Sequence, residues 1–266
     1  HPEADVKPFK VVEDGDVRTV VEGLYGYKKS FACVKFYIPK SGTKIKTEVV
    51  LHMSEASKMI KLSFNTINGE FVGQTAFGTE ILPNEGKAAV FQKFSAITDN
   101  QGAFVISNDG IYGGDYNNGC LNQVLLRTAG YSAHPLPVLP AEENLDGRDD
   151  GMRFLMPDNR YLKHIDMGVR EFAFEFYGDE NINLADYNSA VLNEKPFALC
   201  FFPCGDGEKC GSFITLDNKT ITLSAFKKAY DEKGYIIRLY NSLPADNKAV
   251  VRIPCLNTEK EISFKK

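Results

Sequence analysis

The amino-acid sequence predicts an all-β protein, in which a large antiparallel supersandwich is followed by a small β-sandwich. Segments that alternate apolar and polar residues recur along the whole chain, which is the pattern of half-buried strands. Turn-forming Gly, Asn, Asp and Pro residues separate these segments, and no long segment with helical periodicity lies between them. Such a chain is expected to form antiparallel sheets that stack on one another.

Two segments show the alternation most clearly. In REFAFEFYG, the aromatic residues expected on one buried face are Phe172, Phe174 and Phe176. In KIKTEVVLHM, the apolar residues expected on one face are Ile45, Val49, Leu51 and Met53. We predict further strands in VRTVVEGLYGY, MIKLSF, AAVFQKFSAI, AFVISN, QVLLRT, FALCFF, SFITL, YIIRLY and AVVRI.

The segment SAFKKAYDEKG is compatible with two structures. Ser224 could cap a short helix that ends at Gly234. Alternatively, the strand ITLSAFKKAY turns at residues 231–234 into the strand YIIRLY. Aromatic and β-branched residues on both sides of the turn favour the hairpin, which would bury Tyr235, Ile237 and Leu239 together.

The chain is expected to form two domains. The segment from Ile182 to Pro196 is polar, lacks strand periodicity and ends in proline, and we place the boundary there. The predicted domains are a large β-supersandwich at residues 1–182 and a small C-terminal β-sandwich at residues 183–266.

Composition and charge restrict the partners of this protein. The chain of 266 residues has a formal net charge of -4, and its acidic and basic residues are interspersed. Without a basic block, nucleic acid is not an expected partner. No apolar run is long enough to span a bilayer, and the N-terminal HPEADVKPFK lacks the features of a signal peptide. We therefore expect no membrane partner and a cytoplasmic, bacterial-like location.

Local motifs predict neither a metal site nor a catalytic residue. The three cysteines in CFFPCGDGEKC do not have the paired spacing of zinc ligands, and no histidine lies near them. The glycine-rich GIYGGDYNNG lacks the Lys-Ser/Thr of a Walker loop and does not match G-x-G-x-x-G. It predicts a long hairpin connection in which Gly and Asn supply the positive φ angles.

Several short motifs occur in a characteristic order along most of the chain. They are Glu13, Gly15, Val17 and Arg18; Asn108, Asp109, Gly110, Tyr112 and Gly113; Leu125, Leu126 and Arg127; Asp166, Gly168, Arg170 and Phe172; and Ser224, Ala225, Lys227, Gly234, Arg238 and Asn241. In this order they resemble the C-terminal β region of glycoside hydrolase family 38 α-mannosidases. The resemblance implies a galactose-mutarotase-like supersandwich for the large domain.

The same resemblance implies a retaining α-mannosidase whose nucleophile and zinc ligands lie in a separate N-terminal catalytic domain. Neither motif maps onto this chain, so we expect it to hold no cofactor, and the implied zinc belongs to the catalytic domain. The implied partners are that domain and a mannoside substrate. The leading hypothesis is a non-catalytic C-terminal portion that supports the catalytic domain and shapes its cleft.

A loop near the substrate cleft is also implied, directly after the matched Tyr112 and Gly113. In some family members this loop carries an Asn-Arg-Gly-like triplet, and here Asn118 stands in place of the arginine. The predicted cleft residues are Tyr112, Asp115, Asn117 and Asn118. The two asparagine amides could bind sugar hydroxyls, but no ion pair is expected at position 118. The alternative for this segment is a purely structural hairpin.

Two other functions stay open from the sequence. A free-standing mutarotase-like enzyme could use His52, His134 or His164 with a carboxylate, because anomeric proton transfer needs groups that titrate near neutral pH. A carbohydrate-binding protein is the other alternative, and the absence of tryptophan argues against it.

Overall fold

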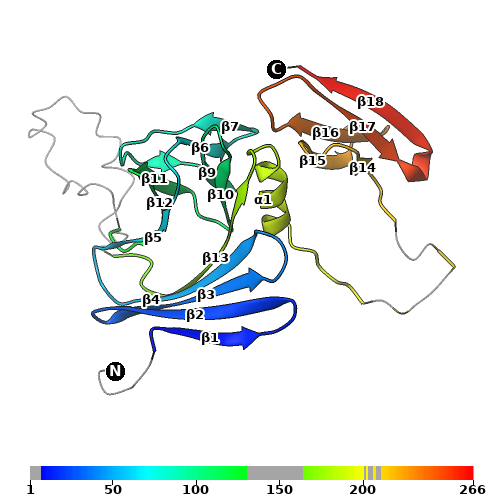
Figure 1. The fold of residues 1–266 in the computed structure, drawn as a ribbon. Helices are drawn as coiled ribbons and strands as arrows, with labels where there is room; N and C mark the ends of the chain where they lie inside the picture. The colour runs from blue at the N-terminus through cyan, green and yellow to red at the C-terminus, as the bar shows by residue number, and fades with distance from the viewer. Residues whose placement is uncertain (1–6, 131–163, 201, 203–205, 208–210, 266) are drawn as a thin grey trace, which may run out of the picture.

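A computed structural model describes residues 7–130, 164–200, 202, 206–207 and 211–265 of the chain (Figure 1). Its described residues form mainly antiparallel strands, which confirms the all-β prediction. No helix among these residues has the length and apolar character needed to cross a membrane.

The largest sheet has nine strands. In spatial order they are β1 (Phe9–Asp14), β2 (Arg18–Tyr27), β3 (Ser30–Pro39), β4 (Ile45–Met53), β13 (Gly168–Asp179), β10 (Ala103–Asn108), β9 (Phe94–Thr98), β6 (Glu70–Thr75) and β7 (Gly78–Ile81). A second sheet of four strands contains β5 (Met59–Asn65), β12 (Cys120–Arg127), β11 (Gly113–Asn117) and β8 (Ala89–Val90).

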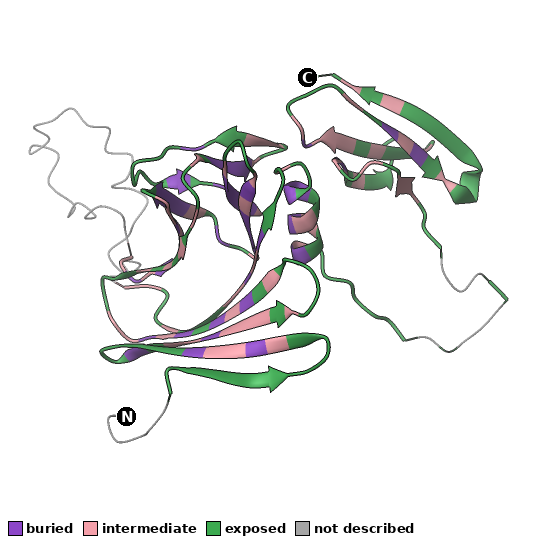
Figure 2. Cartoon of the chain, viewed as in Figure 1, coloured by how far each residue is buried: buried purple, intermediate pink, exposed green. Residues whose placement is uncertain are grey.

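The main hydrophobic core joins these two sheets, as the buried positions in Figure 2 show. Phe174 of β13 is fully buried, and Phe172 and Phe176 pack against the same cluster, so the predicted aromatic face is confirmed. The predicted face of β4 is confirmed as well, because Val49 and Leu51 belong to this core. Strand β12 supplies apolar side chains from the second sheet.

A second apolar cluster lies between the nine-stranded sheet and helix α1 (Ala185–Asn193). Ala185 of the helix joins Val105 and Tyr177 in this cluster. The hydroxyl groups of Ser189 and Ser107 add a hydrogen bond of 2.8 Å between α1 and β10. The domain boundary after residue 182 stays a prediction, but the helix that follows it packs against the large sheet.

The C-terminal strands form two smaller sheets. One contains β14 (Thr215–Leu216), β17 (Asn247–Ile253) and β18 (Thr258–Phe264), with the short 3-10 helix η4 (Pro254–Leu256) between the last two strands. The other contains β15 (Ile221–Lys228) and β16 (Tyr235–Asn241). Lys228 pairs with Tyr235, and the amide of Ala229 donates to the carbonyl of Gly234 at 2.8 Å, which confirms the predicted hairpin.

The predicted burial of Tyr235 is wrong. Its side chain is 68% exposed and stacks on Phe226 with ring centroids 5.3 Å apart, while Ile237 and Leu239 are half-buried. The β15–β16 pair is a sheet of only two strands, so no neighbouring strand covers the end that Tyr235 occupies.

Three predicted strands differ from the structure. SFITL is a strand only at Thr215–Leu216. Residues 197–200 and 202 of FALCFF belong to no strand, and Phe197 and Phe202 are largely exposed. Prolines flank this segment in the sequence, and a proline offers no backbone N–H to a sheet. The segment AAVFQKFSAI forms two strands, because the chain leaves the four-stranded sheet after β8 and enters the nine-stranded sheet at β9.

Candidate functional site

The stretch GIYGGDYNNG is only partly a loop. Residues Gly113–Asn117 form strand β11, which corrects the expectation of one long connection. The reason is that β11 pairs with β8 on one side and with β12 on the other. Asn118 and Gly119, with φ angles of 48° and 76°, make a two-residue turn between β11 and β12. The predicted role of Asn and Gly in supplying positive φ is therefore confirmed.

The four predicted cleft residues lie in different environments. Asp115 is buried, forms an ion pair with Lys61 of β5, and accepts a hydrogen bond of 2.8 Å from the side-chain amide of Asn122. Asn117 and Asn118 are exposed at the end of the hairpin. Tyr112 is also exposed and lies on the connection before β11. The structure therefore separates an ion-paired Asp115 from three exposed side chains.

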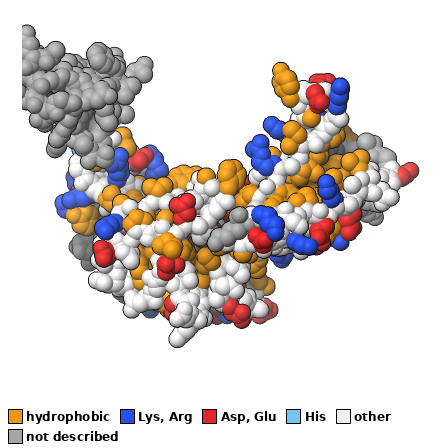
Figure 3. Space-filling view, turned by 90° about the horizontal axis from the view of Figure 1, so that it is seen from above, with side chains coloured by type: hydrophobic (Ala, Val, Ile, Leu, Met, Phe, Trp, Pro, Cys, Tyr) orange, Lys and Arg blue, Asp and Glu red, His pale blue; other side chains and the backbone are white. Residues whose placement is uncertain are grey.

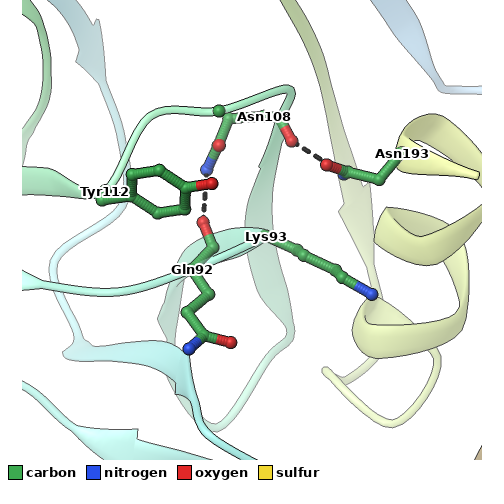
Figure 4. A pocket seen from close by; sticks show the side chains of 6 residues that line it. Gln92, Lys93, Asn108, Tyr112 and Asn193 are labelled. Carbon is green, nitrogen blue, oxygen red and sulfur yellow. Dashed lines mark hydrogen bonds between the residues drawn. The ribbon is translucent and has the colours of Figure 1, made fainter. Parts of the chain in front are cut away.

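Tyr112 lines a surface cavity of about 420 Å³ (Figure 4). The cavity is formed by three segments: the crossing between β8 and β9, the connection from β10 to β11, and the end of α1. Its lining residues are Gln92, Lys93, Asn108, Gly110, Tyr112 and Asn193. We call it the amide cavity, because three of these six residues have carboxamide side chains.

Asn108 holds the three walls of the amide cavity together. This fully buried side chain donates to the carbonyl of Gln92 and accepts from the amide of Ile111, both at 2.8 Å. The backbone carbonyl of Asn108 accepts a hydrogen bond of 2.9 Å from the side-chain amide of Asn193 (Figure 4). Buried amides with satisfied hydrogen bonds fix the surrounding backbone, so Asn108 is a positioning residue of this site.

A buried network behind the cavity reaches the C-terminal sheets. The side chain of Gln74 in β6 accepts a hydrogen bond of 3.0 Å from the amide of Lys93 and donates to the carboxylate of Asp186 in α1. That carboxylate also accepts hydrogen bonds from Thr222 of β15 at 2.9 Å and from Tyr240 of β16 at 2.7 Å. We call Gln74, Asp186, Thr222 and Tyr240 the Asp186 network.

The Asp186 network changes the acidity of one of its members. Burial and the hydrogen bond to the Asp186 carboxylate raise the pKa of Tyr240 to about 12. Tyr240 therefore stays a neutral hydrogen-bond donor at neutral pH. Phe77 packs edge-on against the ring of Tyr240, with ring centroids 5.6 Å apart. The contact between β16 and the large sandwich is therefore partly apolar.

The histidines do not meet at this site. His52 stacks on Phe31 with ring centroids 4.9 Å apart, and His164 lies in an isolated bridge with Ala129. His134 lies outside the described residues, as do Cys204 and Cys210. Among the residues that the structure describes, no group of three or more His, Cys, Asp or Glu side chains could hold a metal ion.

Charges are mixed around the protein. On the face shown in Figure 3, acidic and basic side chains lie interspersed. Next to the amide cavity, the carboxylate of Asp109 is paired with the ammonium of Lys195 at 2.6 Å.

Sequence reasoning found Tyr112 and Asn108 but missed three other lining residues: Gln92, Lys93 and Asn193. The one local signal was the pair Gln92-Lys93, which interrupts the apolar residues of AAVFQKFSAI. Asn193 lies in the segment interpreted as a domain boundary, and nothing in its neighbourhood indicates that α1 would bring it to the cavity.

Comparisons with known proteins give a fold-level match. No family model and no curated protein matches the chain. A solved structure of a protein in glycosyl hydrolase family 38 from Enterococcus faecalis is similar over 92% of this chain and 32% of that chain, with a TM-score of 0.67 and 11% identity. An α-mannosidase from Enterococcus faecalis V583 is similar over 92% of this chain and 31% of that chain, with a TM-score of 0.66 and 10% identity.

These two similarities show the fold at low sequence identity. The chain spans about a third of the length of each of these proteins. This chain therefore has the fold of a region that is found in a structure of glycosyl hydrolase family 38 and in an α-mannosidase structure.

Proposed function

We propose that the chain is a non-catalytic C-terminal portion of an α-mannosidase-like retaining glycoside hydrolase. In this role it supports the catalytic domain and shapes the substrate cleft. The observation that carries the proposal is the similarity of nearly the whole chain to about a third of a glycosyl hydrolase family 38 structure and of an α-mannosidase structure. The ordered sequence motifs that resemble the same family support it independently.

The carboxylates near the amide cavity support a non-catalytic role. A retaining glycosidase uses two carboxyl groups about 5 to 5.5 Å apart, one of which attacks the sugar. Among the residues that the structure describes, no carboxylate lines the cavity, and the nearby Asp109 is paired with Lys195. Asp115 is paired with Lys61, and Asp186 accepts hydrogen bonds inside the domain contact. The zinc that the family resemblance implies would belong to the catalytic domain.

Within this proposal the predicted cleft residues have two kinds of role. Asn117 and Asn118 present exposed amides on a tight turn, and Tyr112 presents an exposed ring, so these three can contact a sugar. Asp115 instead holds β11 and β5 in place through its ion pair with Lys61.

Activity assays of the purified chain test the proposal. We expect no hydrolysis of 4-nitrophenyl α-D-mannopyranoside above the rate in buffer, with or without added zinc. Hydrolysis by the isolated chain would contradict a non-catalytic role. A parallel polarimetric assay with α-D-galactose tests the mutarotase alternative, for which acceleration over buffer that is lost in His52→Ala or His164→Ala would also overturn our proposal.

A further inference from the structure

The nine-stranded sheet extends beyond the four-stranded sheet that packs against it. The four-stranded sheet ends at β5, whose Phe64 packs on Phe176 of β13 with ring centroids 5.2 Å apart. Beyond β13 the nine-stranded sheet continues through β4, β3, β2 and β1. Every residue of β1 is exposed, as Figure 2 shows. The outermost strands are therefore incompletely covered.

Strand pairing shows that the uncovered surface is a continuation of the core face. Phe9 of β1 pairs with Gly23 of β2, which pairs with Val34 of β3. Val34 in turn pairs with Val49 of β4, a residue of the main core. Directly paired residues point to the same face of a sheet. Along this row the exposed fraction rises from 2% at Val49 and 4% at Val34 to 55% at Phe9.

Four apolar and aromatic residues form this surface, which we call the open face: Phe9 and Val11 of β1, and Tyr25 and Tyr27 of β2. Their exposed fractions lie between 48% and 56%. The rings of Phe9 and Tyr25 meet edge to face over Gly23, with centroids 5.9 Å apart. A contiguous apolar surface of this kind is typical of an interaction site.

The edge of β1 favours contact through the open face. The register between β1 and β2 shifts between Val11 and Glu13, so Val12 is an extra residue in β1. Such a bulge, together with the charged Lys10 and Glu13, discourages another strand from pairing with the edge. A partner is therefore expected to pack on the open face, as the second sheet of a sandwich does.

The two ends of the open face carry opposite charges. Asp16 is exposed at the β1–β2 turn, and Lys29 is exposed at the β2–β3 turn. Neither side chain has an ion-pair partner among the described residues. Two copies stacked with their β2 strands antiparallel would bring the Asp16 turn of each copy to the Lys29 turn of the other. The open face is therefore complementary to itself, and a second copy is the occupant that it fits.

We propose that the open face binds the open face of a second copy of this chain in a two-fold symmetric dimer. Each copy then supplies, over β1 and β2, the layer that the other copy lacks. The inference goes beyond the proposed function, which concerns the catalytic domain and the substrate cleft, and it does not depend on that function.

Sedimentation-velocity ultracentrifugation over a range of protein concentrations tests this inference. We expect the mass to rise from 29.6 kDa toward twice that value. Tyr25→Asp places a charge in the interface twice, once from each copy, and should weaken the dimer at least about tenfold. The matched control is Leu24→Asp, because Leu24 is 41% exposed in the same strand but points to the opposite face. This control should leave the dissociation constant unchanged.

An exchange of charges at the two turns tests whether the occupant is a second copy. Asp16→Lys and Lys29→Asp should each weaken the dimer severalfold, because like charges then face each other. The variant with both substitutions restores opposite charges and should recover the affinity of the parent. Both positions are exposed, so these variants should fold as the parent does, and thermal unfolding checks this.

Four results would overturn the inference: a chain that stays monomeric at its highest soluble concentration, an assembly larger than a dimer, a dimer that Tyr25→Asp does not weaken, or a double charge variant that associates as weakly as the single ones. The first result would leave the open face to a different protein. None of these results bears on the α-mannosidase assays, so the two proposals can fail separately.

Discussion

The large sandwich and the C-terminal sheets are stabilised in different ways. Two sheets of the large sandwich enclose a continuous core around side chains such as Phe174, which is fully buried. In the described C-terminal strands, the buried apolar residues are Ile221, Ala249 and Val251 (Figure 2). A small core contributes little hydrophobic free energy, so the position of the β15–β16 hairpin depends more on polar contacts to α1.

The Asp186 network supplies those polar contacts. Its carboxylate binds Gln74 of the large sheet and two donors of the hairpin, Thr222 and Tyr240. Because Gln74 also fixes the backbone of Lys93, the same network supports a wall of the amide cavity. Apolar burial therefore stabilises the large sandwich, whereas a few buried hydrogen bonds position the C-terminal sheets.

The largest expected effect is in the core of the large sandwich. Phe174→Ala removes a fully buried ring and leaves a cavity, so we expect the free energy of unfolding to fall by about 3 to 5 kcal/mol. Urea denaturation followed by circular dichroism measures this change. The control Phe202→Ala removes a ring that is 95% exposed, and it should change stability by less than about 0.5 kcal/mol.

Asp186→Ala should act on the contact between the two regions. It leaves the donors of Gln74, Thr222 and Tyr240 without their acceptor, which costs about 2 to 3 kcal/mol. We expect hydrogen exchange to increase most in β15 and β16 and least in β4. Equal increases throughout the chain would contradict a local role. Glu80→Ala, an exposed position on β7, is the control.

The pH dependence of stability should reveal Tyr240. The folded protein raises the pKa of this phenol from 10.0 to about 12, so the folded state holds its proton more tightly than the unfolded state. The contribution of Tyr240 to the free energy of unfolding is therefore fully present below pH 10 and is lost as the pH rises toward 12. Burial also raises the pKa of Tyr177, so the test is the difference from a variant. In Tyr240→Phe, denaturation midpoints should fall less steeply between pH 10 and 12, and a loss as steep as in the parent would contradict the assignment.

The β11–β12 turn should tolerate substitution less than an ordinary strand position. Gly119 has a φ of 76°, and a methyl group there would lie 3.1 Å from the side-chain oxygen of Asn68. We expect Gly119→Ala to destabilise the protein by about 1 kcal/mol. A methyl group added to Gly26 in β2 would meet no other atom within 4 Å. Thermal unfolding of Gly26→Ala should therefore show no comparable loss of stability.

The smallest effect on stability is expected in the amide cavity. Tyr112→Ala removes an exposed side chain that has no hydrogen-bond partner among the described residues. The free energy of unfolding should therefore change by less than about 0.5 kcal/mol. A larger loss in thermal unfolding would mean that Tyr112 has a structural role like that of Asp186.

Local patterns predicted the parts of the fold that depend on neighbouring residues. The alternation in β4 and β13 predicted their buried faces, and the turn residues near Gly234 predicted the β15–β16 hairpin. The switch between sheets at Phe91 to Lys93 escaped prediction, because the amide of Phe91 donates to the carbonyl of Tyr112, whereas the amides of Gln92 and Lys93 donate to Gln74 of β6. Periodicity contains no information on such a contact.

The candidate site was less predictable for the same reason. Tyr112 was found through the family resemblance, whereas Gln92 and Asn193 reach the cavity from elements far apart in the sequence. Asp186 has an ordinary sequence neighbourhood, and its importance arises from donors on β6, β15 and β16. Only the packing of α1 against the sheet brings these groups together.

The central claim is most directly tested by capturing the protein from the cells that produce it. An antibody against the purified chain should precipitate α-mannosidase activity together with the chain, because the chain is proposed to be part of a larger α-mannosidase-like enzyme. Antibody saturated with the purified chain is the control and should precipitate none. Complete recovery of the chain without any α-mannosidase activity would contradict the account.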